Sequence, residues 1–213
     1  MTLRLAFVLA LCASLAGAQA PPAPRIAASS FASVEVHINA RHIGARWYDE
    51  DAGLAGPSRI AITYGQPHAR GRIVEGGLMP LDTIWRLGAN AATTLHTDVD
   101  LTLGDLHVPR GDYSLFLRYS RSATQLIVNR GTGQWGTEYD RSKDLGRVSV
   151  ASRPLAGPVE SLTISLVPEA AQPTSGLAEL RGTLKIQWGT TEFSIGWRGP
   201  HVPPPGIEPG HKV

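Results

Sequence analysis

Cysteine is almost absent from this sequence of 213 residues, which contains only Cys12. That residue lies inside an apolar N-terminal segment that we expect to be removed. A chain without thiols cannot form disulfides, and it cannot use a thiolate as a nucleophile or a metal ligand. We therefore expect the hydrophobic core to hold the folded domain together, for which roughly 190 residues are sufficient.

The N-terminal segment has the layout of a secretory signal peptide. A positive start with Arg4 precedes an apolar run from Leu5 to Leu15. This run is shorter than the about 20 residues that a membrane-spanning helix needs. Small residues follow, and we predict cleavage after Ala18, with Ala20 as the alternative. The predicted signal peptide is therefore residues 1–18, and we expect the mature protein in the periplasm or outside the cell.

A strong excess of one charge is missing too. The formal net charge is +2, and the basic residues are scattered along the chain. Nucleic acids and anionic membranes usually bind a clustered basic face. We expect neither a nucleic-acid partner nor a membrane span in the mature protein, and the sequence does not indicate an oligomeric state.

Helical periodicity is the third absence, because no stretch of about 12 residues carries an apolar stripe at helical spacing. Apolar and polar residues instead alternate in short runs, and frequent glycine (23) and proline (16) residues separate these runs. Such alternation is typical of antiparallel strands with one buried face. The runs are 34–38, 60–64, 101–103, 113–119, 126–128, 148–150, 162–166, 184–188 and 193–197.

About ten short strands in one chain indicate an all-β sandwich or barrel. We predict a single antiparallel β-sandwich, jelly-roll-like, over residues 31–198, with at most short helical turns and with long loops at 65–92 and 130–146. Residues 19–30 are a predicted spacer. The proline-rich tail, 199–213, has too few apolar residues to offset its ordering entropy and is expected to be disordered.

Motifs that would name a reaction are missing or lack their context. Residues 131–136 fit G-x-G-x-x-G, but no helix follows to hold a pyrophosphate. The histidines lack the spacing of a zinc site, so we predict no metal and no cofactor. Asp98, Asp100 and His96 are the catalytic candidates, since paired carboxylates can do acid–base work. Their alternation with apolar neighbours favours a solvent-facing role instead.

The stretch Trp85-Arg86-Leu87-Gly88-Ala89-Asn90 has two interpretations. Arginine binds carboxylates and phosphates and stacks on aromatic rings, so a long loop rich in both residue types can form a binding site. Alternatively, Arg86 is buried against an acidic partner and Asn90 only turns the chain. The predicted ligand-binding residues are Tyr64, Arg70, Arg72, Trp85, Arg86, Asn90 and Trp135.

Several segments together resemble the bacterial family called domain of unknown function 2911. The resemblance rests on Tyr64, Pro67, 70–72, 76–80, 85–94, 109–116, 129–136 and 188–190. Members often carry an acidic residue where this chain has Ala91. The resemblance implies an exported, mostly β domain, and it brings no known activity, substrate or cofactor.

Three functional hypotheses follow from these observations. The first is a non-enzymatic binding domain for a small anionic or sugar-like ligand, held by the loop residues named above. The second is a hydrolase that acts on envelope or environmental polymers, with Asp98, Asp100 and His96 as its catalytic groups. The third is a structural envelope domain without a ligand, in which Arg86 is deeply buried and paired.

Overall fold

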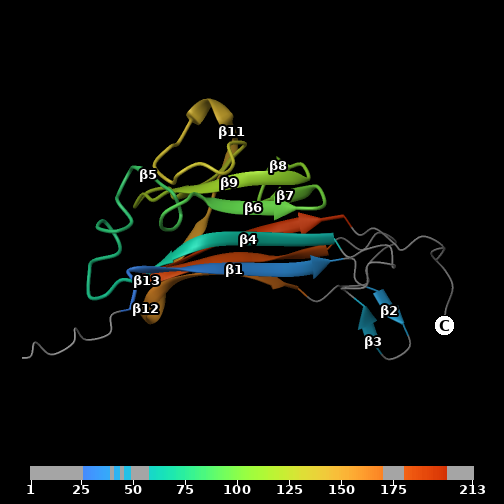
Figure 1. The fold of residues 1–213 in the computed structure, drawn as a ribbon, viewed down its shortest axis with the longest axis horizontal. Coiled ribbons are helices and arrows are strands. Elements are labelled where there is room, and N and C mark those ends of the chain that lie inside the picture. Colours follow the sequence, from blue (N-terminus) through green and yellow to red (C-terminus); the bar gives the residue numbers. More distant parts are fainter. Residues whose placement is uncertain (1–25, 39–40, 44–45, 49–57, 170–179, 201–213) are drawn as a thin grey trace, which may run out of the picture.

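The structure of the protein, a computed structural model, describes residues 26–38, 41–43, 46–48, 58–169 and 180–200. Within these residues, two antiparallel sheets pack against each other (Figure 1). The predicted all-β antiparallel sandwich is therefore confirmed. The predicted signal peptide, most of the predicted spacer and nearly all of the tail lie outside the described residues.

The described elements are almost all strands. They are β1 Ser29–Ile38, β2 Arg41–Ile43, β3 Arg46–Tyr48, β4 Ser58–Pro67, β5 Ile84–Trp85, β6 Thr93–Thr97, β7 Leu101–Leu103, β8 Leu106–Val108, β9 Gly111–Arg118, β10 Gln125–Asn129, β11 Asp144–Ser149, β12 Ala151–Pro168 and β13 Leu180–Gly199, with one 3-10 turn, η1 Arg141–Lys143. In this part of the chain, no helix has the length and apolar character to cross a membrane.

The two large sheets have different strand orders. The first runs β1-β4-β6-β9-β10-β11, and β5 also pairs with β9. The second runs β12-β13-β7-β8, while β2 and β3 form a separate hairpin. A tight turn joins β7 and β8, since Leu103 pairs with Leu106 across Gly104, which has a φ of 58°.

The core lies between the sheets, where the apolar residues of each alternating run point inward. On β4 these are Ile60, Ile62 and Tyr64, and on the facing β12 they include Leu162 and Ile164. The backbone N–H of Ile164 donates to the Tyr64 hydroxyl at 3.1 Å, which ties the two sheets together. Burying one such aliphatic or aromatic side chain stabilises the fold by about 1.5–3 kcal/mol, so this core can hold a domain that has no disulfides.

The runs 184–188 and 193–197 form one bent strand, β13, where the sequence indicated two. Gly189 has a φ of 60°, which bends the strand without ending its pairing with β12. A Cβ atom at Gly189 would lie 2.7 Å from the Glu75 carboxylate. That carboxylate accepts hydrogen bonds from the Thr190 N–H and from the hydroxyls of Thr190 and Thr191. The glycine that seemed to separate two strands is therefore a bend within β13, which the Glu75 carboxylate holds in place. We call it the β13 corner.

Part of the first sheet is covered on both faces. Phe116 of β9 and Ile127 of β10 are buried on the face that points away from the sandwich core, together with Ala92. Ile84 and Tyr139 pack over them, with Phe116 and Tyr139 in edge-to-face contact at 5.0 Å between ring centroids. The loop between β10 and β11 thus lies on the outer face of this sheet, beside the segment that precedes β6 (Figure 1).

Candidate functional site

The Trp-Arg stretch is a loop that leaves the sheet after β5 and returns to it at β6, on the same side of β9. Trp85 of β5 pairs with Leu117, and Thr93 of β6 pairs with Leu115, so both strands lie along the same side of β9. Residues 86–92 therefore leave the sheet and rejoin it opposite Phe116. We call these residues the Trp-Arg loop.

Backbone contacts on two sides hold the Trp-Arg loop. The Ala89 N–H donates to the Gly65 carbonyl on β4 at 2.9 Å, and a Cβ atom at Gly65 would lie 2.0 Å from the Ala89 carbonyl oxygen. On the other side, the Gly136 N–H donates to the Asn90 carbonyl at 3.0 Å. A Cβ atom at Gly136 would lie 2.1 Å from Cδ of Arg86. Glycine is thus required at both contact points.

Trp85 and Arg86 serve the packing of this loop. Trp85 is buried in the core and stacks on Trp188, with ring centroids 5.6 Å apart. Arg86 is half-buried, and its Nε donates to the Gly88 carbonyl at 3.3 Å. Within the described residues Arg86 forms no ion pair, so the acidic partner of the alternative interpretation is not found there.

Arg70 and Arg72 lie in the turn after β4, away from the Trp-Arg loop. Arg72 folds back on this turn, with Nε donating to the Ala69 carbonyl and Nη2 to the His68 carbonyl. The Arg70 N–H donates to the Glu160 carboxylate at 2.6 Å. The Arg70 contact attaches the turn to β12, and neither arginine lines the pockets described next.

A pocket of about 310 Å3 opens on the outer face of the first sheet, where β1, β4 and β6 meet the Trp-Arg loop. Phe31 pairs with Gly65 across β1 and β4, and it is 76% exposed. Of the predicted site residues, Tyr64 and Asn90 belong to the lining. The full lining is Ser29, Ser30, Phe31, Thr63, Tyr64, Gly65, Ala89, Asn90, Ala91, Ala92 and Thr94. We call this the outer-face pocket.

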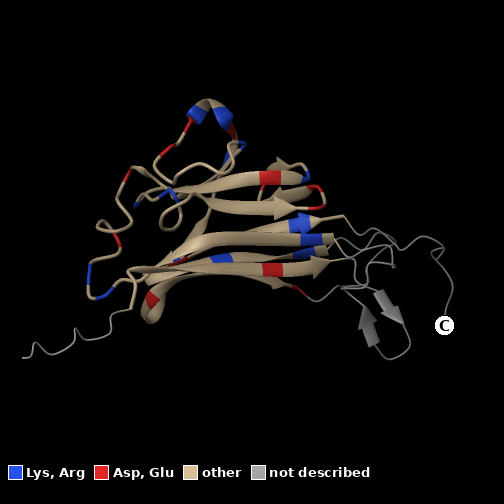
Figure 2. Cartoon of the chain, in the orientation of Figure 1, with Lys and Arg blue, Asp and Glu red and all other residues tan. Residues whose placement is uncertain are grey.

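Hydroxyl and amide groups supply the polarity of the outer-face pocket. The Thr63 and Thr94 hydroxyls lie 3.1 Å apart, and the Asn90 side-chain N–H donates to the Ser29 hydroxyl at 3.3 Å. No lysine, arginine, aspartate or glutamate is among its lining residues. Charged residues lie instead in the loops and toward the other end of the strands (Figure 2). The outer-face pocket is therefore uncharged.

A second pocket, of about 320 Å3, lies in the loop between β10 and β11. Its lining residues are Asn129, Gly131, Thr132, Gln134, Glu138, Tyr139, Asp140 and Lys143. The buried Asn129 shapes it, because its amide N–H groups donate to Asp140 and Asp144 while its oxygen accepts from the Gly131 N–H. We call this the loop pocket.

The hydroxyl of Tyr139 stays protonated at neutral pH in the loop pocket wall. Burial and the hydrogen bond to Asp144 raise the pKa of Tyr139 to about 12. Gln134 also lines this pocket. Its side-chain oxygen is buried and, unlike the Tyr139 hydroxyl, has no hydrogen-bond partner among the described residues. Beside it in the chain, Trp135 is 52% exposed.

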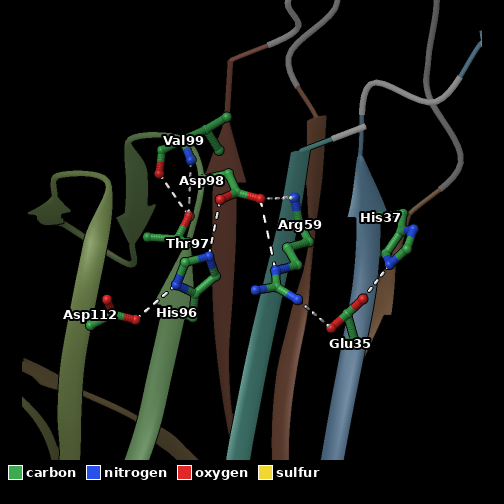
Figure 3. A network of polar contacts seen from close by, with 8 residues as sticks. All are labelled: Glu35, His37, Arg59, His96, Thr97, Asp98, Val99 and Asp112. Carbon is green, nitrogen blue, oxygen red and sulfur yellow. Dashed lines mark hydrogen bonds and ion pairs between the residues drawn. The ribbon is translucent and has the colours of Figure 1, made fainter. Parts of the chain in front are cut away.

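The catalytic candidates His96 and Asp98 belong to a polar network on the outer face of β1, β4, β6 and β9 (Figure 3). His96 lies between two carboxylates, with Nδ1 2.8 Å from Asp112 and Nε2 3.0 Å from Asp98. The Arg59 N–H donates to Asp98 at 2.9 Å, and the Arg59 guanidinium lies 3.7 Å from Glu35. The network thus connects four strands through opposite charges.

Hydrogen bonds in this network keep the Asp98 carboxylate ionised. The hydrogen bond to Asp112 raises the pKa of His96. Partial desolvation lowers it by less, and Asp98 raises it further. Partial burial alone would raise the pKa of Asp98, but hydrogen bonds from Arg59 and His96 lower it overall. Glycoside hydrolysis needs a carboxyl group whose pKa is raised, to act as the acid, whereas Asp98 stays ionised and both nitrogens of His96 are occupied.

Asp100 stands apart from this network. Strand β6 ends at Thr97 and β7 begins at Leu101, so residues 98–100 form a connection between the two strands. The Asp100 carboxylate accepts from the Arg110 N–H at 2.9 Å and so closes a neighbouring turn.

Sequence patterns did not indicate a serine–histidine contact at the edge of the outer-face pocket. The Ser30 hydroxyl lies 3.0 Å from Nε2 of His68, and Nδ1 of His68 lies 2.8 Å from the Ser161 hydroxyl. The Ser30 hydroxyl also lies 3.3 Å from the Gln66 side-chain oxygen, so its single proton can be donated either to Gln66 or to His68. The partners are 38 and 93 residues apart in the chain, so no local motif could have revealed them.

Fold and pocket together define an antiparallel β-sandwich domain with an uncharged pocket on one outer face. Residues 50–196 match the family described as Protein of unknown function (DUF2911), and the chain belongs to this family. The matched residues include the Trp-Arg loop, both glycine contact points and the β13 corner. No curated protein and no solved structure matches the chain significantly.

Proposed function

We propose that this protein is an exported, non-enzymatic binding domain that holds a small neutral, polyhydroxylated ligand, such as a saccharide, in the outer-face pocket. The observation that carries the proposal is the lining of this pocket, which combines an exposed aromatic ring with hydroxyl and amide groups and has no charged residue. Ligand pockets typically pair apolar and aromatic walls with a few polar groups that fix orientation.

The chemistry of the lining favours a sugar over an anion. The hydroxyls of Thr63 and Thr94 can each donate and accept, and the Asn90 amide offers both functions, as ligand hydroxyls require. The ring of Phe31 can pack against the apolar face of a sugar ring. An anion would need cationic groups, but no lysine or arginine lines the pocket, and the Arg72 guanidinium donates to the carbonyls of its own turn.

The size of the pocket and the N-terminal sequence support this proposal. At about 310 Å3, the pocket lies at the lower end of the range of roughly 300–1,000 Å3 for ligand sites, which suits one or two sugar units. Export is supported by the signal-peptide layout of residues 1–18, with its positive start, short apolar run and small residues. An exported protein meets envelope and environmental saccharides.

A binding screen with matched variants tests the proposal. Neutral mono- and disaccharides are titrated into the wild-type protein, Phe31→Ala and Ile73→Ala, with affinity measured by calorimetry. Phe31 and Ile73 are both 76% exposed, and only Phe31 lines the pocket. Loss of the aromatic contact, worth about 0.5–1.5 kcal/mol, should weaken binding by about 2- to 10-fold in Phe31→Ala and leave Ile73→Ala unchanged. Equal affinities for the two variants would contradict the proposal.

The contact between Ser30 and His68 favours acyl transfer as a second candidate function. A histidine within hydrogen-bond reach of a serine can take its proton as the serine oxygen attacks an acyl carbonyl. His68 would then return this proton to the departing alcohol, and water would release the acid from Ser30. The Ser161 hydroxyl is placed to orient the ring of His68.

A fluorophosphonate probe separates this second candidate from simple binding. The probe should label Ser30 in the wild-type protein and fail to do so in His68→Ala, with the modified peptide identified by mass spectrometry. Ser33→Ala is the control, because Ser33 is exposed on the same strand and lies outside the pocket. Absence of labelling at Ser30 would rule out the acyl-transfer function and leave the binding proposal untouched.

A further inference from the structure

We infer that the ligand is an oligosaccharide, and that the outer-face pocket and the loop pocket are two subsites of one site, with Trp135 between them. This inference rests on the proposed saccharide-binding function and extends it from a single unit to a chain. Three features of the molecule support it: a wall shared by the two pockets, an exposed indole on that wall and an unpartnered polar atom in the loop pocket.

The two pockets lie on either side of one pair of chain segments. Ala91 and Ala92 line the outer-face pocket, and Gln134 lines the loop pocket. The Ala92 N–H donates to the Gln134 carbonyl at 3.3 Å, and Ala91 forms an antiparallel bridge with Trp135. Since these residues are bonded to one another, a ligand that leaves one pocket across this wall reaches the other.

Trp135 lies on that wall and belongs to the lining of neither pocket. Its side chain is 52% exposed, which leaves a large part of the indole open to solvent. Indole rings offer a wide, rigid apolar face together with one N–H donor, so they suit ligands with an apolar face and a hydroxylated rim. A sugar unit that passes over the wall would pack on this ring.

The loop pocket contains an acceptor that needs a donor. The side-chain oxygen of Gln134 is buried and unpartnered in the described part of the chain, and a buried polar atom without a hydrogen bond is costly. A ligand hydroxyl in the loop pocket would donate to this oxygen. Thr132, in the same lining, offers a second hydroxyl.

Pocket volumes explain why a chain uses both sites. The pockets measure about 310 and 320 Å3, and each is close to the lower limit of roughly 300 Å3 for ligand sites. Neither pocket alone accommodates a long oligosaccharide. Two linked subsites bind a chain more tightly than either binds one unit, because the second contact is made at high effective concentration.

The test measures affinity against chain length. Glucose and N-acetylglucosamine series of one to six units are titrated into the full mature chain, into Trp135→Ala and into Trp135→Phe, with folding checked by thermal denaturation. For the series that binds, we expect wild-type affinity to rise at least 10-fold between one unit and four, and then to level off. Trp135→Ala should lose this rise and keep the affinity for one unit, and Trp135→Phe should retain part of the rise.

Each other outcome overturns the inference in a recognisable way. If single units bind and added units bring no gain, the two-subsite inference fails while the proposed function stands. An equal loss for single units and chains in Trp135→Ala would place the indole inside one site and would also refute it. If no member of either series binds the wild-type protein, both the inference and its saccharide basis are rejected.

Discussion

Replacing Gly65 by alanine tests whether the Trp-Arg loop is fixed to β4 as the structure indicates. A Cβ atom there would lie 2.0 Å from the Ala89 carbonyl oxygen and 2.7 Å from the Ala89 carbonyl carbon. Both are backbone atoms, so no side-chain rotation relieves the clash. The Trp-Arg loop must shift away, and the hydrogen bond from the Ala89 N–H to the Gly65 carbonyl is lost or lengthened.

The expected loss of stability is the sum of two effects, less one gain. Overpacking costs about 1–3 kcal/mol, and a lost backbone hydrogen bond costs about 0.5–1.5 kcal/mol. Alanine restricts the unfolded chain and returns about 0.4–1 kcal/mol. The free energy of unfolding of Gly65→Ala should therefore fall by about 1–4 kcal/mol, which in a chain of this size lowers Tm on the order of 10 °C.

Urea denaturation followed by tryptophan fluorescence measures this loss, and Gly157→Ala is the matched control. A Cβ atom at Gly157 would have no heavy atom within 4 Å, so this variant should be as stable as the wild type or slightly more stable. If Gly65→Ala proves as stable as Gly157→Ala, the Trp-Arg loop does not press on β4, and the geometry of the outer-face pocket described above is wrong.

Three further predictions concern the rest of the fold. Protonated His96 stabilises the fold through its carboxylate partners. Because its pKa is raised, this stabilisation is complete below the ordinary value of 6.5 and is lost as pH rises through the raised value. Ionised Asp98 has a lowered pKa, so its stabilisation is complete above the ordinary value of 3.8 and is lost as pH falls through the lowered value. The stability difference between wild type and His96→Gln should therefore be largest between pH 3.8 and 6.5, at about 1 kcal/mol or less for such exposed pairs, and a difference that peaks above pH 8 would contradict the network. Partial burial would raise the pKa of Glu75, but hydrogen bonds from its own backbone N–H and from Thr190 and Thr191 lower it overall. Glu75→Gln removes the charge from these hydrogen bonds and should cost about 1–3 kcal/mol in denaturant titrations; no loss at neutral pH would show that the β13 corner does not need the carboxylate. Trp85→Ala should cost about 3–5 kcal/mol, because the buried ring stacks on Trp188, and a loss below about 1 kcal/mol, typical of a surface site, would contradict its place in the core.

Much of the fold could be predicted from the sequence because burial follows a period of two. Ile60, Ile62 and Tyr64 alternate with half-buried neighbours on β4, as the pattern indicates for a strand with one face on the core. The same rule failed at Gly189, where a glycine and two threonines resemble a turn. There the left-handed backbone of one glycine, held by Glu75 from a distant loop, bends the strand and lets it continue.

The candidate site, the outer-face pocket, was harder to predict from the sequence, because its lining depends on the order of the strands in the sheet. Tyr64 and Asn90 were named from the sequence, and both line the outer-face pocket. Phe31 and Thr94 reach the same pocket from β1 and β6, which become neighbours of β4 only through the sheet order.

Closeness in the sequence also led us to group Arg72 and Arg86 with Asn90 in one predicted binding site, but the arginines do not line the pocket. Arg72 and Arg86 share one long loop with Asn90, yet Arg72 donates to its own turn and Arg86 to the Gly88 carbonyl. Composition shows that guanidinium groups are present, and only the backbone path decides where they point.

Chemical-shift mapping tests the central claim most directly. A neutral saccharide that binds in the screen is added to 15N-labelled protein, and the backbone amide shifts are followed to saturation. The largest changes should fall at Phe31, Thr63, Asn90 and Thr94, which line the outer-face pocket. Changes that centre on Arg70, or no changes with any saccharide in the screen, would show that the outer-face pocket is not a saccharide site.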